Sequence, residues 1–469
     1  MSSESELKLL DLAPEVVGHI VKHVEGKKDL ASARLACKAL DQHAAKELFN
    51  EVFVSMGGKD IHMWNKISED DVLRHMPRHA IIHTQKQIEH YSVWDPHPEK
   101  DADDTYIDDD EEDFEEAIAA LSRFPNIESV EIWFSADCLG EEGGYVEVAE
   151  EAWQRKEKLE LIFKAIKDRA AGGKNRTIRS LTIGNLQNIP VPDFTASETF
   201  RDVMSPLEEL HISMIQEYNE AGPDHDYSRV ELRTFPLHLI SCWLQPFAAN
   251  LKALSIYHAN DNWGPFPGYW NFSSLSFPKL ETLALGYYTL AHDGDMDWIL
   301  AIKSLRKLIL HNCMIASWIK ISDGNMPVWN PPTHDWERLD RGENRWRGEA
   351  FAYKGSWSRN WDRIADQLPN LVNFRFDYGE SDVDDYSDEH VYGVNHREEA
   401  QARLFSQRYV VFDNGILPTH WREKDEHRGM YSFMDGGFPV DVHAVNEESD
   451  RSSLEGLVET LRKRAMARA

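Results

Sequence analysis

The 469-residue sequence contains few cysteines and no long apolar run. Its four cysteines, Cys37, Cys138, Cys242 and Cys313, lie far apart and form no CxxC pair. This spacing is typical of a reducing compartment, and it provides neither a disulfide framework nor a zinc motif. No stretch approaches the roughly 18 apolar residues of a membrane span, and the start, MSSESELKLLDL, lacks the features of a signal peptide. We therefore expect a cytoplasmic or nuclear protein without metal, cofactor or membrane partner.

The sequence is also poor in positive charge, with 51 Lys and Arg against 81 Asp and Glu and a net charge of −30. Much of the excess lies in two acidic runs, residues 99–116 and 377–389. Such a balance argues against nucleic acid as a partner, because phosphates would be repelled. Neither run has the spacing of a calcium-binding loop, so we expect solvated, disordered loops there.

Motifs of known catalytic sites are absent as well. We find no GxSxG elbow, no GxxxxGK[ST] loop, no GxGxxG after a strand and no HExxH pair. The 21 histidines are scattered without ligand spacing. We therefore expect no catalytic residues and no enzyme activity, although an unrecognised site within the insertions described below stays open as an alternative.

Residues 10–40 read LDLAPEVVGHIVKHVEGKKDLASARLACKAL and predict short helices. Pro14 fits a first helical turn, and the valines and isoleucine from Val16 to Val24 recur at helical spacing. Gly26 is expected to end this helix, Asp29 to cap a second one, and DQHAAKELF to form a third. Three such helices bury too little surface to be stable alone. They must dock on a partner or cap the domain that follows.

This segment resembles an F-box. The matching residues are Leu12, Pro14, Glu15, Val16, Val17, Ile20, Val24, Asp29, Leu30, Arg34, Leu35, Cys37 and Lys38. Ala13, Ala36 and Leu40 stand where the family usually has Pro, Val and Trp. The resemblance implies docking on the Skp adaptor of a cullin-RING ubiquitin ligase, with somewhat lower affinity than a consensus module. The implied adaptor-binding residues are Leu12, Pro14, Val17, Ile20, Leu30, Leu35 and Cys37.

Beyond residue 120 the pattern Leu-x-x-Leu-x-Leu returns seven times. Its copies begin at Ile127, Ile178, Leu207, Leu251, Leu280, Leu305 and Leu371. Helical stretches precede several copies, and a helix-plus-strand unit must stack on its neighbours to bury its apolar face. The body resembles the irregular leucine-rich-repeat-like horseshoe of fungal F-box proteins, with a doubly wound sheet as the alternative. The expected fold is therefore α/β, a three-helix F-box followed by a leucine-rich-repeat-like solenoid with long insertions.

The expected domains are an F-box at 7–50, a capping region at 51–120 of strand, helix and strand, and a solenoid at 121–420. A tail at 421–469 is expected to end in a closing helix with a capping box at Ser452 and Glu455.

The longest insertion, residues 316–355, is rich in Pro, Gly, Arg and Trp and has no period. Arg and Trp are enriched at binding hot spots, and long loops on a solenoid are often functional. The hypothesis is that Trp336, Arg341, Arg345, Trp346 and Arg347 help to bind the target. The alternative is that the aromatic side chains fasten the insertion to the flank of the solenoid.

Together these features predict a substrate-recognition subunit of an SCF-type ubiquitin ligase. The F-box would dock on a Skp-type adaptor, and through it on a cullin, while the solenoid recruits an unknown protein target. The alternative is an F-box scaffold that acts outside any ligase. The identity of the target is not readable from the sequence.

Overall fold

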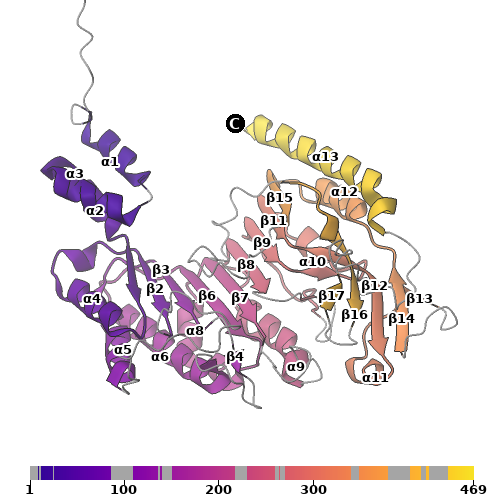
Figure 1. Cartoon of the computed structure of the whole chain (residues 1–469), viewed down its shortest axis with the longest axis horizontal. Coiled ribbons are helices and arrows are strands. Elements are labelled where there is room, and N and C mark those ends of the chain that lie inside the picture. The colour runs from indigo at the N-terminus through magenta and orange to yellow at the C-terminus, as the bar shows by residue number, and fades with distance from the viewer. Residues whose placement is uncertain are drawn as a thin grey trace, which may run out of the picture. The chain divides into compact units, whose positions relative to one another are not determined.

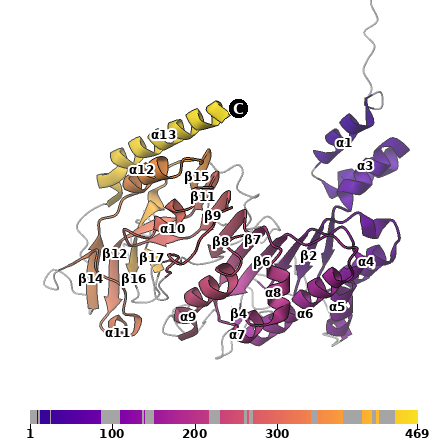
Figure 2. The same cartoon turned by 180° about the vertical axis from the view of Figure 1, so that it is seen from behind.

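The computed structural model describes residues 9, 12–24, 26–85, 109–135, 138–139, 150–216, 230–258, 263–264, 270–339, 348–378, 402–413, 419–421 and 442–468. The chain divides into two compact units. The first unit comprises residues 1–87, 105–132 and 161–179, and the second comprises residues 88–104, 133–160 and 180–469. Figures 1 and 2 show the helices and strands of both units from two sides.

The first unit begins with three helices, as the sequence predicts. They are α1 (Pro14–Lys22), α2 (Lys27–Ala36) and α3 (Lys38–Leu48). Pro14 stands at the start of α1, where its missing N–H costs nothing. The predicted cap of α2 is wrong, because α2 begins at Lys27 with Gly26 as its N-cap and Asp29 lies in its first turn. The helices share a small core of Val17, Val21, Leu30 and Ala44.

Strands and helices alternate in the rest of the first unit. They are β1 (Glu51–Val54), α4 (Gly58–Glu69), β2 (His79–His83), α5 (Asp109–Ala119), β3 (Ser129–Trp133) and α6 (Ala152–Ala171), which runs across the boundary of the units. β1 and β2 pair in parallel, which confirms the predicted strand, helix and strand. The Trp64 indole of α4 donates to the Ala117 carbonyl of α5 at 2.7 Å and so joins these helices.

The expectation of a disordered acidic loop near 99–116 is wrong for its second half, because Asp109 to Glu116 belong to α5. The physical reason is an apolar stripe that begins near the end of the acidic run, at Phe114, and continues beyond it. Phe114, Ala117, Ile118 and Leu121 are fully buried at helical spacing, and the carboxylates keep the solvent side. Residues 99–108 lie outside the described residues.

A parallel sheet dominates the second unit (Figure 1). Its neighbouring strands follow the order of the chain: β6 (Ser180–Gln187), β7 (Glu209–Ile215), β8 (Ala253–His258), β9 (Thr282–Gly286), β11 (Lys307–His311) and β15 (Asn373–Asp377). Together with β3 they account for all seven predicted repeat strands, so that prediction is confirmed. Between them lie α7 (Pro192–Thr195), α8 (Glu198–Met204), α9 (Val230–His238), α10 (Asp297–Leu300) and α12 (Trp357–Gln367). The short strands β4 (Cys138–Leu139) and β5 (Glu150–Glu151) pair with each other.

The repeat residues align across this sheet in two buried rows. One row holds Leu210, Leu254, Leu283, Leu308 and Phe374, and the other holds Ile212, Ile256, Leu285, Leu310 and Phe376. Every member is at most 5% exposed. Because the strands share one register, the apolar residues that recur along the sequence pack side by side and form one continuous core.

A second sheet is built mainly from the long insertion. Its strands are β13 (Trp336–Arg338), β14 (Gly348–Tyr353), β12 (Met314–Ser322), β16 (Tyr409–Asp413) and β17 (Thr419–Trp421), with β10 (Thr289–Leu290) beside β12. The insertion also holds α11 (Met326–Trp329). The expectation that residues 316–355 lack regular structure is therefore wrong. The β12 sequence is apolar, and its antiparallel pairing with β14 buries both strands.

The chain ends in α13 (Val442–Arg468), which packs on α12 (Figures 1 and 2). Of the apolar stripe that the sequence predicts here, Leu454, Leu457 and Leu461 are buried, whereas Val458 is 40% exposed. The predicted start is wrong, because the helix begins at Val442 and Ser452 lies inside it. Arg464 donates to the carbonyls of Ala365 and Leu368 and so satisfies the last turn of α12.

Candidate functional site

The three N-terminal helices divide the predicted adaptor-binding residues into two groups. Val17 and Leu30 are each 5% exposed and belong to the internal core, against which the half-buried Leu12 packs. Pro14 is exposed, Ile20 is 41% exposed, and Leu35 is 89% exposed in the last turn of α2. The second group is therefore available to a partner, and the first group holds the helices together.

Cys37 and Val16 are two further apolar residues of these helices that are not fully buried. Cys37 is half-buried and extended, with φ −166° and ψ 159°, at the junction between α2 and α3. Val16 is 45% exposed and was not among the predicted docking residues. Its spacing from Ile20, four positions along one helix, places both side chains on one face of α1 and was the signal that could have identified it.

Helix α1 approaches α3 closely at Gly18. A Cβ atom at this position would lie 2.8 Å from Nδ1 of His43. On the solvent side, Arg34 of α2 pairs with Asp41 of α3 at 3.0 Å between Nε and Oδ1. An exposed pair of this kind adds little stability, so the small core and the close approach define the geometry of the helices.

Trp336, the first of the predicted target-binding residues, is buried at 7% exposure. Its indole donates to the Ala291 carbonyl at 2.6 Å, and its ring stacks on His292 with centroids 4.8 Å apart. Trp336 therefore fastens the insertion, which is the alternative role that the sequence left open. The other four residues, Arg341, Arg345, Trp346 and Arg347, lie outside the described residues, and their role stays a prediction.

The loop after β10 forms a polar cluster beside Trp336. His292 shares a hydrogen bond of 2.7 Å between Nδ1 and Oδ1 of Asp335, and Asp295 accepts the backbone N–H groups of Ala291 and His292. Burial raises the pKa of the Asp295 carboxyl to about 6, against the opposing effect of His292. These contacts bind the loop to itself and to the start of β13, which is a structural role.

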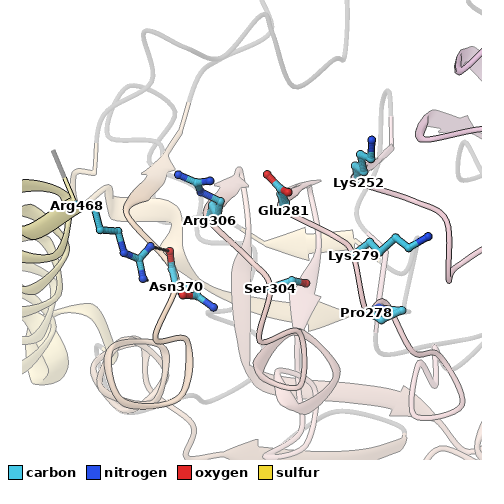
Figure 3. Close-up of a pocket in the computed structure, with 8 residues that line it drawn as sticks. All are labelled: Lys252, Pro278, Lys279, Glu281, Ser304, Arg306, Asn370 and Arg468. Carbon is cyan, nitrogen blue, oxygen red and sulfur yellow. Dashed lines mark hydrogen bonds between the residues drawn. The ribbon is translucent and has the colours of Figure 1, made fainter.

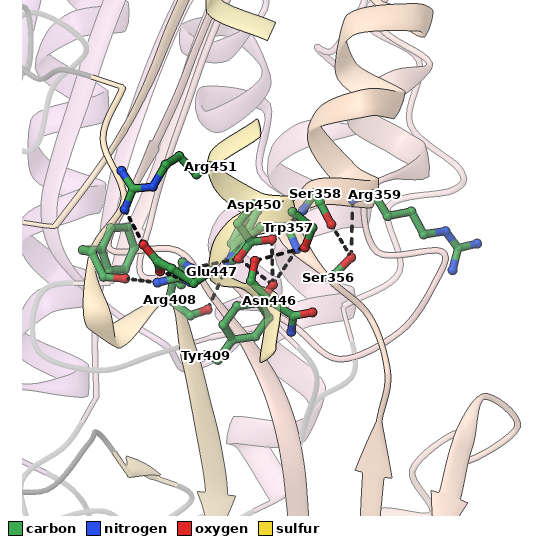
Figure 4. A network of polar contacts seen from close by, with 12 residues as sticks. Ser356, Trp357, Ser358, Arg359, Arg408, Tyr409, Asn446, Glu447, Asp450 and Arg451 are labelled. Atoms are coloured by element: carbon green, nitrogen blue, oxygen red, sulfur yellow. Dashed lines mark hydrogen bonds and ion pairs between the residues drawn. The ribbon is translucent and has the colours of Figure 1, made fainter. Parts of the chain in front are cut away.

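A second buried network surrounds Asp450 of α13 (Figure 4). Its carboxylate is fully buried and accepts hydrogen bonds from Arg408 Nε at 2.9 Å, from the Ser358 backbone at 2.9 Å and from the Tyr409 hydroxyl at 2.9 Å. Burial first, and then the Asp450 charge, raises the pKa of Tyr409 well above its usual value. The network holds α13 against α12 and β16.

A hollow of about 600 Å³ opens within the second unit (Figure 3). Its lining residues are Lys252, Pro278, Lys279, Glu281, Ser304, Arg306, Asn370 and Arg468. Sequence reasoning missed this hollow, because its charged residues are spread over more than 200 positions and come together only through strand pairing.

Within the residues that the structure describes, no three His, Cys, Asp or Glu side chains are grouped so as to hold a metal ion. No helix of the same residues combines the length and apolar character needed to cross a bilayer. No protein-family model matches the sequence, and no curated protein matches it.

Proposed function

We propose that the protein is a substrate-recognition subunit of an SCF-type ubiquitin ligase, in which helices α1 to α3 dock on a Skp-type adaptor. The observation that carries this proposal is the exposed apolar surface of these helices. Val16, Ile20 and Leu35 remain 41 to 89% exposed although α1 and α2 already bury Val17, Val21 and Leu30 against α3. Exposed apolar side chains on a small helical module favour a protein interface.

Burial of these exposed side chains against a partner would favour binding. Burying a Leu or Ile side chain contributes about 1.5 to 3 kcal/mol. Leu35, the most exposed of the three, is therefore expected to be a hot spot, since a few well-buried anchors supply most of the affinity of an interface.

The second unit would then recruit the target as a leucine-rich-repeat-like solenoid. In-register parallel strands in chain order support this reading over a doubly wound sheet. A turn residue with positive φ also recurs two positions after the last apolar residue of three repeats, at Asn185, Tyr287 and Asn312. Cys313 follows the last of these and donates its thiol hydrogen to the Leu285 carbonyl of the preceding repeat at 3.4 Å.

The test is co-expression of the full chain with a tagged Skp-type adaptor, followed by quantitative capture. Wild type should be retained, and Ile20→Asp and Leu35→Asp should each reduce retention at least about tenfold, because a buried, unpaired carboxylate is costly. Gln42→Asp is the matched control, since it adds the same charge at an exposed polar position of α3. Circular dichroism and thermal melting should show that all three variants fold.

Absence of adaptor capture by folded wild type would refute the proposal, as would unchanged capture of both apolar-to-Asp variants. Deleting residues 7–50 separates a ligase subunit from a scaffold. A ligase subunit loses target turnover but keeps target binding, whereas a scaffold shows no change in turnover. Trp346 and the three Arg residues of the insertion stay candidates for the target contact.

A further inference from the structure

The hollow of about 600 Å³ in the second unit lies at the amino-terminal edge of the parallel sheet. Lys252, Glu281 and Arg306 each directly precede a strand, β8, β9 and β11 respectively. Their backbones continue the ladder, since Glu281 N–H donates to the Lys252 carbonyl at 2.8 Å and Arg306 N–H to the Glu281 carbonyl at 2.7 Å. Their side chains therefore stand in one row on adjacent strands (Figure 3).

Cations dominate this hollow in an otherwise acidic chain. Lys252, Lys279, Arg306 and Arg468 line it together with a single carboxylate, Glu281. The local excess is three positive charges in a protein whose net charge is −30. Such an arrangement favours an anionic ligand.

Protein contacts orient two of these cations and leave two available. Arg468 donates to the carbonyl and side-chain oxygens of Asn370, both at 2.8 Å, and Lys252 pairs with Glu208 at 2.7 Å. Among the residues that the structure describes, no hydrogen bond or ion pair engages the side chains of Lys279 and Arg306. Both are exposed, so they can close on a ligand without breaking a contact of the fold.

The floor of the hollow is fixed by neutral polar groups. Ser304 donates its hydroxyl hydrogen to the Leu280 carbonyl at 2.7 Å, and the Asn370 amide donates to the Lys303 carbonyl at 2.8 Å. The cations thus line a hollow whose neutral polar groups are held by hydrogen bonds to the backbone. A long polyanion would also meet the negative charge of the rest of the chain, which favours a single compact anionic group.

We propose that this hollow binds a phosphomonoester group, carried either by a small molecule or by a phosphorylated protein side chain. Such a group has a charge of about −1.5 to −2 at pH 7 and three strong acceptor oxygens. Arg and Lys donate charge-assisted hydrogen bonds to it, and the Arg306 guanidinium offers two parallel N–H groups.

Glu281 gives the site a means of discrimination. A phosphomonoester loses its second proton near pH 6, so a fraction of it keeps a hydroxyl that can donate to a carboxylate. A sulfate group has no such proton near neutral pH and is repelled by Glu281. The site should therefore prefer phosphate over sulfate, although both are tetrahedral anions.

This inference does not depend on adaptor docking, because every lining residue belongs to the second unit. The Leu35→Asp variant, which is designed to lose the adaptor, should bind phosphate as wild type does. Failure of one proposal therefore leaves the other intact.

The experiment is calorimetric titration of the full chain at pH 6.5 and constant ionic strength. The probes are inorganic phosphate, inorganic sulfate, free O-phosphoserine and a neutral heptapeptide that carries one phosphoserine. Wild type should bind the phosphate probes saturably and sulfate at least about fivefold more weakly. Equal affinity for phosphoserine and the phosphopeptide identifies a small molecule as the ligand class, and tighter peptide binding identifies a phosphorylated side chain.

Three variants test the location of the site. Arg306→Gln and Lys279→Gln should each weaken phosphate binding about fivefold or more, whereas Glu281→Gln should raise the affinity for sulfate and abolish the preference. Lys463→Gln is the control, because it removes an exposed cation of α13 outside the hollow. The proposal is overturned if wild type shows no saturable phosphate binding below about 20 mM, or if the Arg306→Gln/Lys279→Gln double variant binds as wild type does. An unchanged preference in Glu281→Gln overturns the role of Glu281.

Discussion

Replacement of Asp450 by Ala is expected to release α13 from the body of the second unit. Asp450 is fully buried, and Arg408, its ion-pair partner at 2.9 Å, is 2% exposed. The same carboxylate accepts the Ser358 backbone N–H and the Tyr409 hydroxyl (Figure 4). The substitution therefore removes an acceptor from the buried Arg408 guanidinium, from the buried Tyr409 hydroxyl and from the part-buried Ser358 N–H.

The expected loss of stability follows from the burial of the Asp450–Arg408 ion pair. Removing one partner of a buried ion pair costs about 3 to 5 kcal/mol, because the other charge stays desolvated. Arg408 keeps Glu447 at 2.8 Å, but this carboxylate is 43% exposed and compensates only in part. At about 1.4 kcal/mol for each factor of ten, protection of α13 against hydrogen exchange should fall about 100- to 1,000-fold.

Hydrogen exchange with mass spectrometry on peptides of α13 measures this loss directly. Glu459→Ala is the control on the same helix, since its pairs with Arg462 and Lys463 are exposed and worth at most about 0.5 kcal/mol. The Arg408→Met/Asp450→Leu double variant should recover most of the protection, because it removes both buried charges. A loss of less than tenfold in Asp450→Ala would show that the network does not hold the helix.

Two further predictions concern the sheet and the loop after β10. A Cβ atom on Gly286 would lie 1.9 Å from the Tyr257 ring, so Gly286→Ala should lower the free energy of unfolding by about 1 to 3 kcal/mol. Gly324→Ala is the control, because its Cβ meets open space and should leave the thermal midpoint nearly unchanged. Equal midpoints for both variants would contradict the close packing at Gly286. Burial raises the pKa of Asp295 to about 6, above its value of about 4 in the unfolded chain. Between these two pKa values the native state therefore binds more protons than the unfolded state. As a result, Asp295 lowers the free energy of unfolding as the pH rises through that window. Urea titrations at pH 5 and pH 7.5 should therefore show Asp295→Asn gaining stability relative to wild type at the higher pH, and a difference independent of pH would disprove the raised pKa.

The repeat strands could be predicted because their signal is local and repeated. In LRKLIL, for example, Leu305, Leu308 and Leu310 fix both the existence of a strand and the face that it buries. Parallel neighbours then align equivalent residues, as the register of Leu283 with Leu308 illustrates. A period in the sequence thus contains most of the information needed for the main sheet.

The insertion and the acidic run could not be predicted in the same way. β12 pairs with β14 and with β16, and the second pairing joins Ile315 to Tyr409 across more than ninety residues without a local signal. In the acidic run the count of carboxylates concealed the buried stripe that starts at Phe114. Composition describes the solvent side of such a segment, whereas its fold depends on the few residues that face inward.

The N-terminal helices raise a harder problem, because both faces of α1 are apolar. Val17 and Val21 lie four positions apart and are buried, while Val16 and Ile20 lie four positions apart and are exposed. Hydrophobic periodicity cannot choose between these stripes, since each satisfies the same spacing. The choice is made by α3, which presents the small Ala44 to the core and approaches α1 at Gly18.

Substitutions in the two stripes are therefore expected to have different effects on stability and on adaptor capture. Val17→Ala should lower the stability of the helices by about 0.5 to 3 kcal/mol and reduce adaptor capture only indirectly. Ile20→Asp should leave the melting curve unchanged and remove capture. A residue of this segment belongs to the docking surface only if its substitution weakens adaptor capture and leaves the stability of the helices unchanged. This difference between the two measurements identifies the interface, and agreement with a sequence pattern does not.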